Sequence, residues 1–249
     1  VEFNERVVNS QLTKNTFTVS DRTVEKIYSN TRPERTDIVK DGRFVIIELN
    51  PKDSGASLRL EGNDEVGFQM KKATSKITQK EDILFTNGKK LEKSIAILEN
   101  NKTRNLIVEN FKQFVYKDPK TGTSVKYNLY IPKNYDKNKK YPLVLFMHDK
   151  GVLSEDTKTT LLQGNGATSF AAPEEQAKHE AFVLAPQYSK QVVDDNGDIT
   201  SDLDATVNLI RDYLISKYSI DEKKLYATGQ SMGGMMAIVM NYKYPELFA

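Results

Sequence analysis

The sequence predicts two folds in one chain: an all-β sandwich in the first half and an α/β domain in the second. Short runs rich in β-branched and aromatic residues recur over residues 1 to about 110, with turn signals between them. From about residue 112 the pattern changes to near-continuous apolar runs, which are typical of strands buried on both faces of a mostly parallel sheet. A helical repeat of apolar residues separates two of these runs, and that alternation predicts α/β architecture.

The composition is that of an ordinary globular protein and excludes several function classes. The 249 residues carry a net charge of +2 with both signs interspersed, unlike the basic patch of a nucleic-acid-binding protein. No apolar run approaches the roughly 18 residues of a membrane-spanning helix. Cysteine is absent and there are two histidines, so neither disulfides nor a zinc site are expected. We therefore expect no nucleic-acid, membrane or metal partner.

The first half reads as a series of short strands that build a sandwich. In the run over residues 43–49, Val45, Ile47 and Leu49 fall on one face, and the opposite face is also largely apolar. This strand is therefore expected to be central in two packed layers. The dipeptides Asp41-Gly42 and Asn87-Gly88 predict two-residue hairpin turns, because both central positions of such a turn need positive φ. The strands are expected over 16–20, 23–29, 43–49, 57–62, 65–71 and 94–100.

The second half reads as strands and helices in alternation. A hairpin is expected over residues 111–132, around the turn PKTG. Leu203, Val207, Ile210 and Leu214 recur at helical spacing, and Ser201 with Asp204 is typical of a capping box. Buried strands are expected over 141–148, 181–188 and 223–229, and helices over 201–218 and from Met232 until Pro245 ends the run.

The motif G-x-S-x-G occupies residues 229–233, between the last buried strand and the last helix. Strand–turn–helix is the context that distinguishes a nucleophile elbow from a chance match. Gly229 and Gly233 lack β-carbons, so the strand and the helix can approach closely around a strained Ser231. The motif therefore predicts Ser231 as the catalytic nucleophile.

An oxyanion hole needs two hydrogen-bond donors near the developing negative charge. We expect one to be the backbone N–H of Met232, and the other to be the backbone N–H of Asp149 or Lys150 in the loop after an earlier strand. His148 is expected to shape this loop, although a role as the base stays open, and His179 is expected to be a surface residue.

The second half resembles the α/β-hydrolase superfamily, from about Lys126 to Ala249. More closely, it resembles bacterial carboxylesterases grouped with predicted peptidases and feruloyl-esterase-like enzymes, some of which carry an N-terminal immunoglobulin-like domain. The resemblance is carried by YPLVLFMHDKG, EEQAKHEAFVLAPQ, DLDATVNLI, LYATGQSMGG and KYPELFA. It implies an immunoglobulin-like sandwich over 1–110 and the N-terminal part of a hydrolase domain over 111–249.

Two departures from that family bear on catalysis. The family usually has glycine after the loop histidine, where this chain has Asp149, which adds a negative charge near the oxyanion. The family carries its acid, usually aspartate, and its catalytic histidine on later strands, and no such strands precede Ala249. The resemblance therefore implies that the acid and base come from a segment beyond Ala249 that completes the domain, and that the 249-residue chain alone is a weak or inactive hydrolase.

The expected function is hydrolysis of small-molecule carboxylic esters through an acyl-enzyme on Ser231, with no metal or organic cofactor. Two alternatives stay open: a non-catalytic binding protein on a degenerate hydrolase scaffold, and a serine peptidase of the same fold. The segment 161–176 is expected either to line the substrate cleft or to be a plain surface connection. The chain begins at Val1, and no signal peptide is visible. A start without methionine is consistent with a trimmed mature form, so a secreted or periplasmic location is favoured over a cytoplasmic one.

Overall fold

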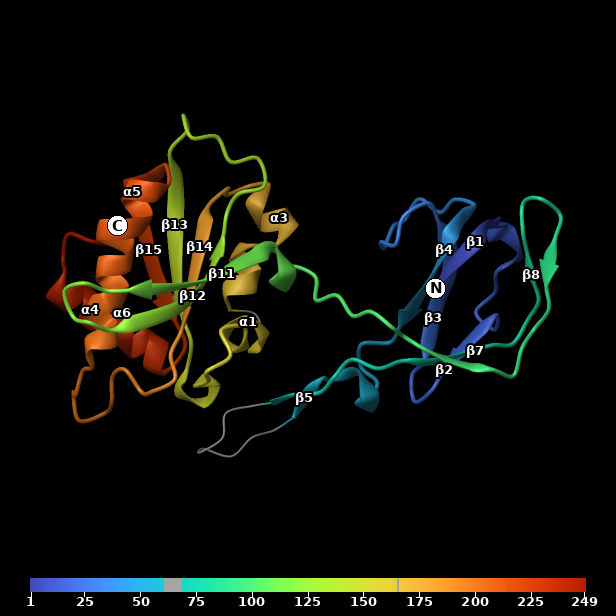
Figure 1. Ribbon diagram of the computed structural model, residues 1–249, viewed down its shortest axis with the longest axis horizontal. Helices are drawn as coiled ribbons and strands as arrows, with labels where there is room; N and C mark the ends of the chain where they lie inside the picture. Colours follow the sequence, from blue (N-terminus) through green and yellow to red (C-terminus); the bar gives the residue numbers. More distant parts are fainter. Residues whose placement is uncertain (61–68, 165) are drawn as a thin grey trace. The chain divides into compact units, whose positions relative to one another are not determined.

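A computed structural model describes residues 1–60, 69–164 and 166–249 and divides the chain into two compact units (Figure 1). The N-terminal unit comprises Val1–Leu60 and Gln69–Thr103, and the C-terminal unit holds the described residues from Arg104 onward. The predicted division into domains at residues 110 and 111 stays a prediction.

The N-terminal unit is a β-sandwich, which confirms the predicted fold class. Two three-stranded antiparallel sheets, in the orders β1-β4-β3 and β10-β7-β2, enclose a core of Val7, Phe17, Ile27, Val45 and Ile83. The strand predicted to be central, β4, lies between β1 and β3. The strands are β1 (Glu2–Val7), β2 (Phe17–Val19), β3 (Val24–Asn30), β4 (Gly42–Leu49), β5 (Arg59–Leu60), β6 (Gln69–Met70), β7 (Lys76–Gln79), β8 (Ile83–Leu84), β9 (Lys90–Leu91) and β10 (Ile97–Glu99), with short 3-10 helices η1 (Asn9–Gln11) and η2 (Ser54–Ala56).

Of the two predicted hairpin turns, Asn87-Gly88 is present and Asp41-Gly42 is not. Asn87-Gly88 does close a hairpin between β8 and β9, but Phe85 N–H donates to the Lys89 carbonyl, so the loop has three residues, and only Gly88 has positive φ (+83°). The turn predicted at Asp41-Gly42 is wrong, because β3 and β4 are joined by residues 31–41 and Gly42 lies within β4. A β-carbon on Gly42 would lie 1.9 Å from the carbonyl oxygen of Asn30, so close strand approach requires this glycine.

The strands predicted over 57–62 and 65–71 fall partly outside the described residues. The described ends of these runs form β5 and β6, which pair antiparallel, Arg59 with Met70 and Leu60 with Gln69.

The C-terminal unit is a five-stranded mixed sheet in the order β11-β12-β14-β13-β15. β14, β13 and β15 run parallel, and β11 and β12 form the predicted antiparallel hairpin at one edge. In Figure 1 the helices α1 and α3 lie on one side of this sheet and α4, α5 and α6 lie on the other. The strands are β11 (Phe111–Lys117), β12 (Ser124–Tyr130), β13 (Tyr141–Met147), β14 (Phe182–Gln187) and β15 (Ile220–Gly229).

Two apolar clusters cover the two faces of this sheet. Successive side chains of a strand point to opposite faces, and β13 shows this directly. Leu143 and Leu145 belong to the larger cluster with Met236 of α6, whereas Phe146 belongs to the smaller cluster with Leu161 of α1. The helices are α1 (Thr159–Leu162), α2 (Ala167–Phe170), α3 (Pro173–Gln176), α4 (Ser201–Asn208), α5 (Ile215–Lys217) and α6 (Met232–Lys243), with 3-10 segments η3 (Val108–Asn110) and η4 (Lys150–Val152) and a π-helical segment η5 (Leu209–Leu214).

The predicted helix over 201–218 is present as the continuous run of α4, η5 and α5, but its capping box is wrong. Thr200 precedes the helix, and no side chain caps its first turn. The Ser201 hydroxyl instead pairs with Thr123 Oγ1 at 2.7 Å, and the Asp204 carboxylate binds Lys243 Nζ at 2.6 Å and the Tyr244 hydroxyl at 2.7 Å. The acidic side chain is therefore used to tie α4 to the end of α6.

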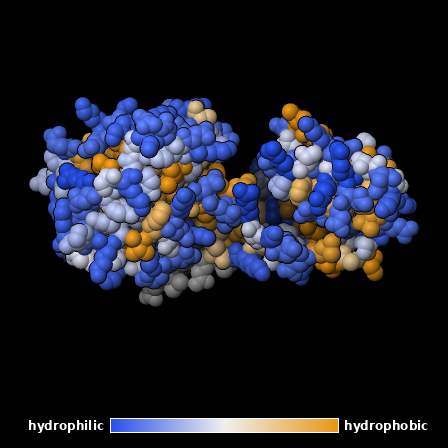
Figure 2. Space-filling view, turned by 45° about the horizontal axis from the view of Figure 1, so that its top comes forward, coloured by the Kyte–Doolittle hydropathy of each residue, from blue (hydrophilic) through white to orange (hydrophobic). Residues whose placement is uncertain are grey.

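On the face shown in Figure 2, hydrophilic residues dominate and hydrophobic residues form small groups. No helix in the described ranges combines the length and the hydrophobicity that crossing a bilayer requires. Nor do the described side chains place three or more histidines or carboxylates where they could share a metal ion.

Candidate active site

Ser231 occupies the sharp turn between β15 and α6, where the motif predicts it. Its backbone has φ of +49° and ψ of −116°, a conformation that L-residues with a side chain rarely adopt. Such strain costs on the order of 1–3 kcal/mol and is concentrated at functional sites. The side chain is exposed at the carboxyl edge of the parallel strands, which is where ligands bind in open α/β sheets.

The two motif glycines make this turn sterically possible. A β-carbon on Gly229 would lie 2.4 Å from the carbonyl carbon of Gly233 and 2.7 Å from the carbonyl oxygen of Met147. A β-carbon on Gly233 would lie 2.0 Å from that same Met147 oxygen. The end of β13, the end of β15 and the first turn of α6 therefore meet backbone to backbone around Ser231.

The first turn of α6 leaves a donor beside the serine. Gly233 N–H donates to the Gln230 carbonyl at 2.9 Å, and Met235 N–H donates to the Ser231 carbonyl at 3.0 Å. Among the described residues, no acceptor takes the N–H of Met232. This N–H begins a twelve-residue helix, whose dipole favours negative charge at that end. Met232 thus has the position and the free donor that an oxyanion hole needs.

The second predicted donor lies in the loop that follows β13. Met147 is in register with Gly229, and its carbonyl accepts the Gln230 N–H at 3.2 Å, so residues 148–150 follow directly beside the elbow. Within the described part of the chain, the N–H groups of Asp149 and Lys150 have no acceptor. The Asp149 carboxylate lies next to its own loop: its Oδ1 is 2.9 Å from the position that a β-carbon on Gly151 would occupy.

His148 is fully buried, and both ring nitrogens are engaged. Nε2 of His148 accepts a hydrogen bond from the Tyr188 N–H at 2.9 Å, because that group can only donate. Nδ1–H donates to the Asp149 carbonyl at 2.7 Å, because a carbonyl can only accept. Burial lowers the pKa of His148, against a smaller raising effect of the bond to Asp149. His148 is therefore a neutral histidine that holds the loop, and it has no free nitrogen to take a proton from Ser231.

Gln187, at the end of β14, is a residue that sequence reasoning missed. Its buried amide accepts the Thr160 N–H at 2.7 Å and donates to the Val152 carbonyl at 2.8 Å. It also lies 3.3 Å from Nε2 of His148. The amide therefore joins the loop after β13 to β14 and α1. The sequence signal that could have identified Gln187 is its place as the polar residue at the end of the apolar run FVLAPQ.

One side chain of the segment 161–176 contacts the elbow. The side chain of Gln163, just after α1, donates from Nε2 to Oε1 of Gln230 at 3.1 Å. Gln230 is the residue before Ser231. This contact favours a place for the segment at the rim of the cleft, and that place stays a prediction.

His179 lies away from the elbow. Its side chain is 73% exposed, and Nδ1 pairs with Glu175 Oε1 at 2.7 Å on the helical turn after α3. The two histidines of the chain are thus a buried loop residue and a surface residue. Neither is placed to act as the base for Ser231.

A strained serine at the carboxyl edge of a parallel sheet, with free N–H groups beside it, defines an α/β-hydrolase. The chain belongs to the family described as "Putative esterase", whose model matches residues 119–249. A second model, described as "Esterase Ig-like N-terminal domain", matches residues 1–92. Both matches confirm the resemblance inferred from the sequence.

Solved and curated relatives agree with this family. The structure of a thermostable esterase is 30% identical, with a TM-score of 0.91, and the match covers 100% of this chain and 70% of that chain. A probable feruloyl esterase C from Aspergillus terreus is 28% identical over 116 residues, 46% of this chain and 40% of the relative. Acetylxylan esterase A from Aspergillus ficuum is 57% identical over 37 residues, 15% of this chain and 12% of the relative. The chain thus matches less than half the length of these two curated relatives.

Proposed function

We propose that this chain carries the nucleophile and the oxyanion hole of a serine carboxylesterase. The observation that carries the proposal is the strained backbone of Ser231, at φ of +49°, directly before the free N–H of Met232. A strained turn that exposes a hydroxyl next to unpaired donors has no evident structural use. It has a clear chemical use in acyl transfer.

In the proposed reaction, Ser231 Oγ attacks the acyl carbon of an ester while a base takes the hydroxyl proton. The N–H of Met232 and an N–H of Asp149 or Lys150 bind the oxyanion that forms. Collapse of the tetrahedral intermediate expels the alcohol, which takes a proton from the protonated base, and leaves an acyl-enzyme on Ser231. Water then attacks the acyl carbon and releases the acid. No step requires a metal or an organic cofactor.

The acid and the base are proposed to come from a segment beyond Ala249. Two observations on the described residues support this. His148 and His179 are committed elsewhere, as described above. In addition, β15 pairs with β13 on one side only within the described ranges. Beside this strand lies an apolar groove of about 460 Å³, walled by residues that include Pro142, Val144 and Tyr226. The groove lies on the face of the sheet that carries Val144 and Tyr226, and a segment that continues the domain past β15 would cover it.

The relatives suggest a substrate class. The curated relatives quoted above are named as a feruloyl esterase and an acetylxylan esterase. We therefore extend the proposal to acetyl and hydroxycinnamoyl esters carried on a carbohydrate. A secreted or periplasmic location stays a prediction.

The test uses a longer form of the chain that includes the segment beyond Ala249. It compares 4-nitrophenyl acetate and methyl ferulate with a peptide 4-nitroanilide. The proposal predicts turnover of the esters, and loss of that turnover by about 10³-fold or more in Ser231→Ala. Ser216→Ala, on the exposed side of α5, is the matched control and should keep wild-type turnover.

Three results would decide against the proposal. Ester turnover that survives in Ser231→Ala would remove the nucleophile. Preferred cleavage of the anilide would favour a serine peptidase. The absence of any turnover from a folded longer chain would favour a binding protein on a hydrolase scaffold.

A further inference from the structure

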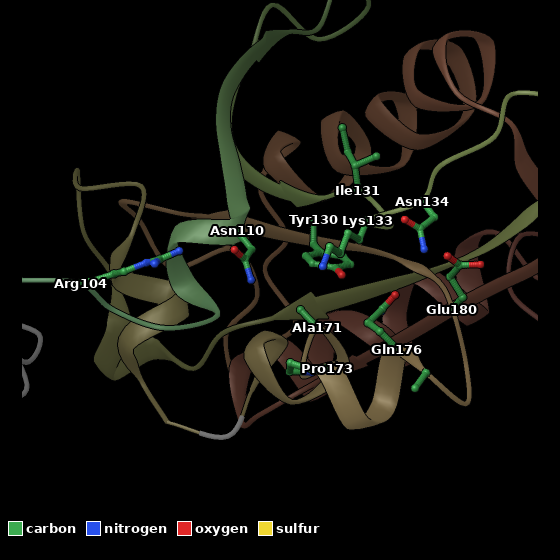
Figure 3. Close-up of a pocket in the computed structure, with 11 residues that line it drawn as sticks. Arg104, Asn110, Tyr130, Ile131, Lys133, Asn134, Ala171, Pro173, Gln176 and Glu180 are labelled. Atoms are coloured by element: carbon green, nitrogen blue, oxygen red, sulfur yellow. The ribbon is translucent and has the colours of Figure 1, made fainter. Parts of the chain in front are cut away.

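A cavity of about 690 Å³ lies in the C-terminal unit (Figure 3). Its walls come from the segment before β11, the end of β12 and the region of α3. Glu180, which precedes β14, lines it, whereas Gln187 at the other end of β14 contacts His148. The six residues of β14 span about 20 Å. The cavity is therefore separate from the proposed ester site, and its volume suits a small molecule.

The cavity offers polar groups that the fold does not use. Within the described ranges, the exposed side-chain amides of Asn110 and Asn134 and the hydroxyl of Tyr130 have no hydrogen-bond partner in the protein. Tyr130 is 8% exposed, and burial raises the pKa of its hydroxyl, with Glu180 adding to the effect. In Figure 3 the side chains of Asn134 and Glu180 point toward one another. These groups are suited to a ligand that carries several hydroxyls.

The charges around the cavity favour a negative ligand. Arg104 and Lys133 both line it. The Arg104 Nε pairs with Glu109 at 3.5 Å, and among the described residues its terminal nitrogens have no ion-pair partner. The Glu180 carboxylate is already paired with Lys139 Nζ at 2.6 Å. The planar guanidinium binds a carboxylate through two parallel N–H···O bonds. Within the described ranges, the cavity therefore combines amides that can bind hydroxyls with two cations, Arg104 and Lys133, that can bind a carboxylate.

The segment that presents Arg104 and Asn110 is strained. Ile107 has φ of +67° and ψ of −51°, which is a genuine outlier for a β-branched residue. This conformation starts η3, whose last residue, Asn110, donates its N–H to the Ile107 carbonyl at 2.9 Å. Glu109 fixes the start of the same segment by accepting the Asn105 N–H at 2.9 Å. Strain of this kind is concentrated at ligand sites.

We propose that this cavity binds a carboxylate-bearing sugar of the hexuronic acid class. Its carboxylate pairs with Arg104 and Lys133, and its hydroxyls bond to the amides of Asn110 and Asn134. The small apolar side chains of Ala171 and Ala177 provide the surface for the C–H face of the ring. This site does not involve Ser231, so its test is independent of the test of the esterase proposal.

The test measures binding to the 249-residue chain by isothermal titration calorimetry with three probes. These are the methyl glycoside of glucuronic acid, the methyl glycoside of glucose, and acetate. The glucuronide is expected to bind about tenfold more tightly than either of the other probes, because only it has both the carboxylate and the hydroxyls.

Variants locate the site. Arg104→Gln and Lys133→Gln, changes to exposed side chains, should each reduce the preference for the glucuronide, and the double variant should abolish it. Lys223→Gln on β15, at the other edge of the sheet, is the matched control and should bind as wild type does, as should Ser231→Ala. Equal binding of acetate and glucuronide would indicate a simple anion site and overturn the proposal. Absence of saturable glucuronide binding, or a preference that survives in the double variant, would also overturn it.

Discussion

The carbonyl oxygen of Met147 lies 2.0 Å from the position that a β-carbon on Gly233 would occupy. The last residue of β13 and the first turn of α6 are therefore in direct backbone contact. This contact sets the loop of residues 148–150 beside Ser231, because the loop begins one residue after Met147. The proposed oxyanion hole thus depends on a glycine that has no chemical role of its own.

Gly233→Ala is expected to displace the first turn of α6 from β13 and to lower the free energy of unfolding by about 1–3 kcal/mol. Gly234→Ala is the matched control, because a β-carbon there would make an ordinary contact of 3.5 Å with the Gly229 carbonyl. That change should be neutral or stabilise the helix by up to about 1 kcal/mol. Urea unfolding of both variants measures the difference, and equal effects would contradict the contact.

His148 should make the stability of the C-terminal unit depend on pH. Burial lowers its pKa in the folded protein, whereas the unfolded chain has a histidine of ordinary pKa, about 6.5. Below that pH the unfolded state therefore binds more protons than the folded state. The free energy of unfolding is thus highest above about pH 6.5 and falls as the pH decreases. The free energy of unfolding should fall more steeply between pH 7 and 5 in the wild type than in His148→Asn. His179→Asn, at an exposed position, should keep the wild-type slope, and a flat wild-type profile would be evidence against the buried neutral histidine.

Asp149 should slow the reaction that the elbow supports. Its carboxylate lies in the loop proposed to bind the oxyanion, so its negative charge opposes the developing charge. In a longer, active form, Asp149→Asn is expected to raise kcat about tenfold, a size typical of one nearby charge at a partly screened site. Asp221→Asn, near the start of β15, controls for the change in net charge. A loss of kcat in Asp149→Asn would assign the carboxylate a supporting role instead.

The N-terminal unit should fold without the rest of the chain. Its two sheets enclose a core of their own, which includes Val7, Phe17 and Val45. Residues 1–105 are therefore expected to give a β-type circular dichroism spectrum and to unfold cooperatively. A disordered fragment would show that the unit needs contacts from residues beyond 105.

The sequence predicted features whose cause is local. Ser231, Gly229 and Gly233 could be assigned because a strand, a sharp turn and a helix follow one another directly in the chain. The buried strands β13 and β14 could be assigned because apolar residues occupy both of their faces.

Features with distant causes could not be predicted in the same way. Gly42 is required by the carbonyl of Asn30, twelve residues earlier, and not by the turn that its own neighbour suggests. His148 is fixed by the Tyr188 N–H, 40 positions away, and by contact with the Gln187 amide. Until the strands are paired, nothing near His148 in the chain distinguishes a loop-holding histidine from a base.

We propose that Ser231 is the nucleophile and that its base is not His148. The most direct measurement is the turnover of 4-nitrophenyl acetate by the 249-residue chain, by its Ser231→Ala and His148→Asn variants, and by a longer form carrying the segment beyond Ala249. We expect little or no Ser231-dependent turnover from the 249-residue chain, because a serine without a base is a weak nucleophile. We expect efficient Ser231-dependent turnover from the longer form. Efficient turnover by the 249-residue chain that is lost in both variants, with their folds intact, would contradict this proposal and make His148 the base.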